Sequence, residues 1–134
     1  MISKSLIPTV FLAASAAIPA HAQMNEDGKS QYMVACAICH GESALGDGNF
    51  SEMMNIDVPG LTKLALENDG VFPWLEVFSI VDGRSHVKGH GTPMPIWGDR
   101  FSATAREEFG SYGAEVVTSG RIAVLVDYLG SIQE

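Results

Sequence analysis

Apolar residues recur every three or four positions in two stretches of the second half of the chain. The stronger stretch lies near the C-terminus and contains Ile122, Leu125, Val126, Leu129 and Ile132. The other follows Pro73, which suits the first turn of a helix, ends at Gly83 and contains Trp74, Val77, Phe78 and Val81. Because this spacing places the apolar side chains on one helix face, we expect two helices that each bury one face.

Capping signals predict where further helices begin. Asn25 suits an N-cap, and Glu26 and Asp27 favour the first turn of a helix that runs on into Cys36. Two shorter helices are expected at residues 62–68, before a turn signal at 68–70, and at residues 102–109, capped by Ser102.

Glycine and proline interrupt the pattern in two other segments. Residues 41–60 and 89–98 are rich in both and are expected to be loops. No segment shows the alternation typical of a strand, and no internal repeat is visible. We therefore expect an all-α fold of a single domain.

The first 22 residues resemble a leader for export. Lys4 provides a thin positive region, residues 6–18 are mostly apolar, and Ala20-His21-Ala22 has the small-x-small pattern of a cleavage site. We expect residues 1–22 to be a cleaved signal peptide and 23–134 to be the mature domain, located in the periplasm. The alternative is an uncleaved membrane anchor. No later segment has the length and continuous apolarity of a membrane span.

The chain is acidic, with 8 Lys and Arg against 16 Asp and Glu and a formal net charge of −8. This charge makes nucleic acid an unsuitable partner, because phosphates repel carboxylates. An acidic surface favours encounters with proteins that carry basic docking surfaces. The other interpretation of the charge is solubility alone.

The strongest chemical signal is Cys36-Ala37-Ile38-Cys39-His40. Cys-x-x-Cys-His is the spacing that attaches a c-type haem, with two thioether bonds and the adjacent imidazole on the iron. Both cysteines of the chain belong to this motif, so we expect one covalently bound haem c with His40 as an axial iron ligand. Such attachment occurs outside the cytoplasm, in agreement with the leader.

A second axial ligand must come from elsewhere in the chain. Met94 lies between Pro93 and Pro95 in a glycine-rich segment, where restricted backbone freedom suits the presentation of one thioether. His86 and His90 compete for the same role. We predict Met94 as the ligand, because a methionine between two prolines in a glycine-rich segment is poorly explained as core filler. A His/Met pair would raise the reduction potential and close the iron to small molecules.

With these residues in place, the chain resembles a class I cytochrome c along nearly all of its mature length. That family crosses its N-terminal and C-terminal helices through a glycine and an aromatic on one helix and an aliphatic and an aromatic on the other. The matching pairs here are Gly28 with Tyr32, and Leu125 with Tyr128. Residues 61–73 and 94–99 further resemble a bacterial subgroup of small exported cytochromes.

The resemblance also implies roles around the haem. Pro59, in a Pro-x-Leu sequence after the motif, would accept a hydrogen bond from His40 Nδ1 through its carbonyl oxygen, which orients the ring. Trp97 would pack on the haem edge or bond a propionate. Arg84, His90 and Arg100 would neutralise propionates, with surface salt bridges or packing as equal alternatives for all four residues.

Three competing interpretations use the same residues. A zinc site would combine Cys36 and Cys39 with His86 and His90, although the intervening segment is far longer than in a zinc finger. A redox dithiol would use the two cysteines alone. A catalytic or sensing haem would leave the distal side open or bind a histidine there.

The interpretation that we favour is a monohaem cytochrome that carries single electrons between redox proteins. It is an electron carrier and not an enzyme, either free or as a subunit of an oxidoreductase complex. Because a domain of this size buries limited apolar surface alone, we also expect the haem-free form to be largely unfolded.

Overall fold

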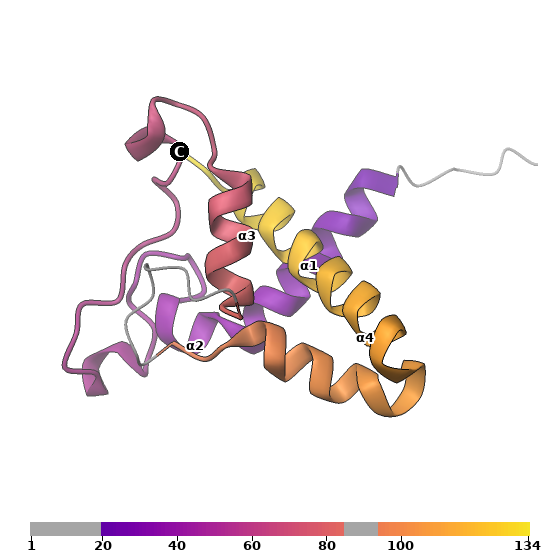
Figure 1. Cartoon of the computed structure of the whole chain (residues 1–134). Coiled ribbons are helices and arrows are strands. Elements are labelled where there is room, and N and C mark those ends of the chain that lie inside the picture. The colour runs from indigo at the N-terminus through magenta and orange to yellow at the C-terminus, as the bar shows by residue number, and fades with distance from the viewer. Residues whose placement is uncertain (1–19, 85–93) are drawn as a thin grey trace, which may run out of the picture.

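The computed structural model describes residues 20–84 and 94–134, which form four α-helices and two short 3-10 turns. The elements in chain order are α1 (Ala20–Ala35), α2 (Ala37–His40), η1 (Ser51–Met53), η2 (Leu66–Asn68), α3 (Trp74–Asp82) and α4 (Trp97–Ser131) (Figure 1). This part of the chain contains no strand, so the expected all-α class is confirmed.

The longest element, α4, is two helical segments that meet at Gly110. The backbone there has φ 66° and ψ −179°, a conformation that glycine adopts and residues with a side chain rarely do. In Figure 1 the chain turns sharply at this point, and its yellow second segment runs back across α1.

The crossing of α1 and α4 is close because a glycine lies at the contact. A Cβ atom on Gly28 would overlap the Val124 carbonyl oxygen and lie 2.7 Å from Tyr128 Cβ. One turn further along α1, the rings of Tyr32 and Tyr128 are 5.5 Å apart. The helix contacts expected from Gly28, Tyr32, Leu125 and Tyr128 are therefore present, with Leu125 fully buried beside them.

The core lies where α1, α3 and the second segment of α4 meet. Four of the five residues in the apolar stripe of the last helix are buried, namely Ile122, Leu125, Val126 and Leu129, whereas Ile132 is half-buried and lies just past the end of α4. On α3, Val77 and Val81 are buried and Trp74 and Phe78 are half-buried, as their spacing predicts. The Trp74 indole also donates a hydrogen bond of 2.6 Å to Asp127 Oδ1, which ties α3 to α4.

Several predicted helix starts are wrong. Asn25 is inside α1, which begins at Ala20, because nothing in Gln23 or Met24 interrupts a helix. Ser102 is inside α4 and bonds back to the Asp99 carbonyl oxygen.

Two segment assignments also need correction. Trp97 and Gly98 were expected in a loop but begin α4. Within residues 62–68, only η2 is helical. The preceding turn is held from elsewhere in the chain, because the Ala65 N–H donates a hydrogen bond to the Gln133 side chain. Residues 89–93 of the expected loop lie outside the described residues.

Within residues 20–84 and 94–134, no helix combines the length and the apolar character that a membrane crossing requires.

Candidate functional site

The Cys-x-x-Cys-His motif lies where α1 passes into α2. Helical hydrogen bonds continue through it, from Cys36 N to Tyr32 O at 2.8 Å and from His40 N to Cys36 O at 2.9 Å. Cys36 is buried, Cys39 is half-buried, and both are free thiols. The motif is thus an ordered helical turn that presents two unpaired sulfur atoms beside a buried imidazole.

The His40 ring is held in one orientation by the loop that follows the motif. Its Nδ1 lies 2.9 Å from the Pro59 carbonyl oxygen, the contact expected from the sequence. Burial lowers the pKa of His40, and the bond to Pro59 only partly opposes this shift, so the ring is neutral. Because a carbonyl oxygen can only accept, the proton is on Nδ1 and the lone pair is on Nε2. A neutral imidazole with this tautomer is suited to bind a metal through Nε2.

A network of hydrogen bonds holds the Pro59 segment in place. Gly46 N donates to His40 O at 2.8 Å, and Leu61 N donates to Ala44 O at 2.7 Å. The Gln133 side chain adds two bonds from the other end of the chain, accepting from Ala65 N at 2.9 Å and donating to Leu61 O at 2.8 Å. Gln133 could not be singled out from the sequence, because a polar residue after a helix has no periodic partner.

Tyr32 connects the helix crossing to the motif. Its side chain is fully buried, and its hydroxyl donates a 2.6 Å bond to the Gly41 carbonyl oxygen, directly after His40. Burial raises the pKa of Tyr32, with a smaller contribution from the nearby Cys36. The hydroxyl therefore remains protonated and serves as a fixed donor.

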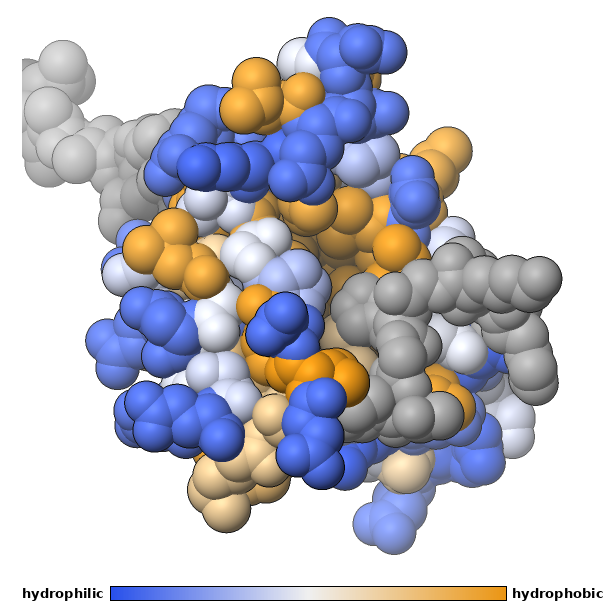
Figure 2. All heavy atoms as spheres, turned by 90° about the vertical axis from the view of Figure 1, so that its left-hand side faces the viewer, coloured by the Kyte–Doolittle hydropathy of each residue, from blue (hydrophilic) through white to orange (hydrophobic). Residues whose placement is uncertain are grey.

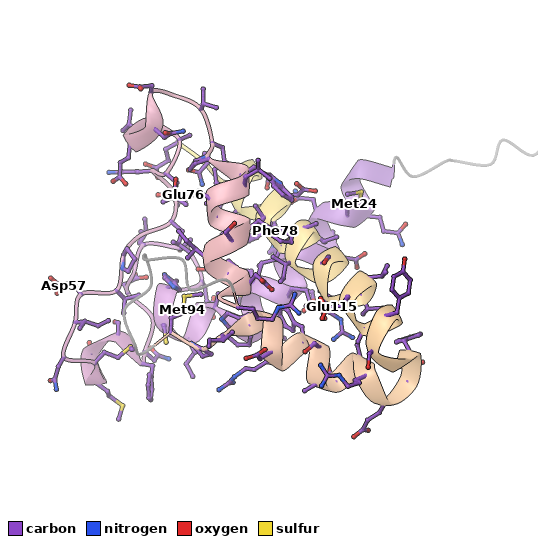
Figure 3. All side chains as sticks on the ribbon, in the orientation of Figure 1. Met24, Asp57, Glu76, Phe78, Met94 and Glu115 are labelled. Atoms are coloured by element: carbon purple, nitrogen blue, oxygen red, sulfur yellow. The ribbon has the colours of Figure 1, made fainter. Side chains whose placement is uncertain are left out.

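Met94 is half-buried, and in the view of Figure 3 its side chain lies over the region of α2. Two residues further on, Ile96 precedes the first turn of α4, so the start of that helix fixes the chain just after Met94. The competing candidates His86 and His90 lie outside the described residues.

The remaining candidate residues make contacts with other side chains. Trp97 is half-buried, with its ring 5.6 Å from that of Phe101 and the Arg100 guanidinium 5.3 Å from its centre. Arg84 pairs with Asp82 and Glu115 at 2.8 Å each. For Arg84 and Arg100 the structure thus supports the surface alternatives, salt bridge and packing.

Apolar side chains surround this part of the molecule without being fully buried. Figure 2 shows hydrophobic side chains gathered in the middle of one face, set back behind a hydrophilic rim. The half-buried apolar residues that pack on the core include Leu61, Leu64, Phe72, Phe78 and Trp97. These side chains, the free thiols and a His40 Nε2 without a hydrogen-bond partner among the described residues could together hold an apolar cofactor that also needs a nitrogen ligand.

The redox-dithiol alternative finds less support in the local chemistry. Burial raises the pKa of the Cys36 thiol to about 12, with a further contribution from Cys39, whereas a redox dithiol needs a readily formed thiolate. Among the residues described, no three His, Cys, Asp or Glu side chains group as a metal site. The zinc ligands considered at His86 and His90 lie outside these residues.

Comparisons with models of protein families, with curated proteins and with solved structures found no match.

Proposed function

We propose that this chain is an exported c-type cytochrome of class I, with one covalent haem, that carries single electrons between redox proteins. The observation that carries the proposal is the motif itself. Two free thiols, Cys36 and Cys39, lie on one helical turn with a buried His40. Its Nδ1 is bonded to the Pro59 carbonyl oxygen, and its Nε2 has no hydrogen-bond partner among the described residues. The crossing of α1 and α4 at Gly28 and Tyr128 supports the same family.

Each residue of the site has a distinct task in this proposal. Cys36 and Cys39 would hold the haem covalently through their sulfur atoms, and His40 Nε2 and Met94 Sδ would supply the two ligands of its iron. The haem supplies a one-electron iron couple. The Pro59 carbonyl holds the His40 ring and increases its basicity, while Leu61, Phe78 and Trp97 exclude water from the porphyrin. With both iron ligands supplied by the chain, the protein would be a carrier and not an enzyme.

The test of this ligand set compares two methionines. In haem-loaded protein, Met94→Ala should abolish the weak long-wavelength absorption band that iron–thioether coordination gives in the oxidised state, and should lower the reduction potential. Met53→Ala is the matched control, because Met53 is 74% exposed and should leave both properties unchanged. If the unchanged protein binds haem but lacks the band, the second ligand is a histidine or is absent, and the sensing or catalytic alternative replaces the carrier.

The surface beside the motif favours a partner with a basic docking site. Between Lys29 and Lys63 the chain contains no Lys or Arg, and its four acids, Glu42, Asp47, Glu52 and Asp57, are all exposed. The same stretch of chain carries six exposed apolar side chains, namely Val34, Ile38, Leu45, Phe50, Met53 and Ile56. We call these acidic and apolar residues the acidic apolar surface. Exposed apolar groups combined with one sign of charge are typical of protein docking sites.

Charged electron acceptors test this surface directly. Tris(phenanthroline)cobalt(III), a cation, should oxidise the reduced protein more slowly after Glu42→Lys and Asp47→Lys, while ferricyanide, an anion, should do so faster. Glu107→Lys with Glu108→Lys makes the same change in net charge near the Gly110 bend, away from the motif in Figure 1. Equal effects of both pairs of substitutions would contradict docking at the acidic apolar surface.

A further inference from the structure

The end of α3 and the start of α4 are joined by close contacts. Gly83 ends α3 with φ 67°, and a Cβ atom there would lie 3.3 Å from Ile96 Cγ2. The two neighbours of Gly83 in the chain, Asp82 and Arg84, lie even closer to α4. A Cβ atom on Gly98 would overlap the Asp82 carboxylate and lie 2.5 Å from Arg84 Nε. The close approach therefore requires a glycine at position 98.

Charged side chains reinforce the junction. Asp82 is buried, and its Oδ1 accepts a 2.8 Å hydrogen bond from Arg84 Nε. Arg84 Nη1 also donates to both oxygens of Glu115, at 2.8 and 2.9 Å. Glu115 belongs to the second segment of α4, at the level of the lower end of α3 in Figure 3. One guanidinium thus connects the end of α3 with α4 on both sides of its bend.

We propose that Asp82, Arg84, Glu115 and Gly98 act as positioning residues for Met94, and this inference rests on the proposed role of Met94 as an iron ligand. Met94 lies between Gly83 and Gly98 in the chain, two residues before Ile96, so the junction fixes the point from which its side chain extends. When the junction loosens, the thioether is held less firmly and a competing ligand replaces it more easily.

Imidazole is a suitable probe, because it competes with a weak thioether for oxidised haem iron. We would titrate haem-loaded protein with imidazole and follow the loss of the thioether band. Glu115→Ala should raise the apparent imidazole affinity about threefold, the range of a partly exposed ion pair. Gly98→Ala should raise it about tenfold, because the added methyl displaces both Asp82 and Arg84.

Glu108→Ala is the matched control. It removes the same charged side chain from the same helix, and Glu108 forms no ion pair with any residue in the described ranges. Its imidazole affinity should equal that of the unchanged protein. A residue that only stabilises the fold would lower the unfolding midpoint without changing the imidazole affinity under folding conditions.

The outcomes separate this inference from the proposed function. The positioning role would be overturned if the protein bound haem and showed the thioether band, but Glu115→Ala, Gly98→Ala and Glu108→Ala had equal imidazole affinities. The carrier function would then remain intact. Absence of haem, or of the thioether band, would overturn the ligand assignment and the positioning role with it.

Discussion

Replacing Gly28 by alanine tests the helix crossing on which the whole arrangement depends. The new methyl would overlap the Val124 carbonyl oxygen and approach Tyr128 Cβ to 2.7 Å. Neither atom can move by a side-chain rotation, so α1 and α4 must separate. Overpacking of this kind costs about 1–3 kcal/mol, and the better helix propensity of alanine returns about 1 kcal/mol. Weaker packing of Tyr32 on Tyr128 adds to the loss, which gives a net destabilisation of about 1–2 kcal/mol.

Gly120→Ala provides the control of opposite sign. Gly120 also lies within a helix, but a Cβ atom there would meet nothing within 4 Å. Alanine should therefore stabilise the protein by about 0.5–1 kcal/mol. Because both changes are glycine to alanine, their effects on the unfolded chain largely cancel in the comparison.

The assay is urea unfolding of haem-loaded protein, followed by circular dichroism at one pH and temperature. Gly28→Ala should unfold at lower urea than the unchanged protein and Gly120→Ala at higher urea, with similar slopes. Equal stability of the two variants would refute the close approach of α1 and α4 at Gly28.

Three further predictions concern the surroundings of His40. Tyr32→Phe leaves the Gly41 carbonyl without its 2.6 Å bond and should lower the unfolding free energy by about 1–2 kcal/mol without preventing haem attachment; an unchanged urea midpoint would count against the bond. Gln133→Leu removes the side-chain hydrogen bonds to Leu61, Ala65 and Leu129 and should lower the unfolding free energy by about 1–3 kcal/mol in the same assay. An unchanged unfolding free energy would show that these bonds do not stabilise the segment around Leu61. Burial lowers the pKa of His40 in the folded chain, and iron at Nε2 would exclude a proton there as well, so the unfolded state gains a proton below about pH 6.5 that the folded state does not bind. The unfolding free energy should therefore fall between about pH 7.5 and 5.5, and a flat profile over this range would contradict a neutral His40 ring in the folded state.

The sequence was most informative where the physical signal is local and repeated. The stripe that includes Ile122 and Leu129 predicted a buried helix face, because a period near 3.6 leaves one arrangement that hides every apolar side chain. Helix starts were predicted less well. Asn25 and Ser102 have side chains that suit caps, but favourable residues before each of them allow the helix to begin earlier.

The bend of α4 lies just past the end of the helix that was predicted at residues 102–109. Gly110 and Gly113 are both permissive, yet only Gly110 adopts a positive φ. The local pattern did not indicate that a helix resumes directly after Gly110 and packs along α1, because contacts between residues far apart in the chain determine that packing.

The contacts of the candidate site likewise include some that the sequence predicted and some that it did not. The contact between His40 and Pro59 was expected from the resemblance to class I cytochromes c, in which a Pro-x-Leu sequence follows the motif. The bonds from Gln133 to Leu61 and from Arg84 to Glu115 join residues far apart in the chain, which no local pattern encodes. Such contacts depend on how the helices pack in three dimensions, so they could be identified only from the structure.

Mass spectrometry of the tryptic peptide that contains the motif tests the central claim most directly. Because no Lys or Arg occurs between Lys29 and Lys63, trypsin should release residues 30–63 as one peptide with Cys36, Cys39 and His40. From cells that possess the machinery for haem attachment, this peptide should carry the mass of one covalent haem, and replacement of both cysteines by alanine should remove it. An unmodified peptide with two free thiols would contradict the account.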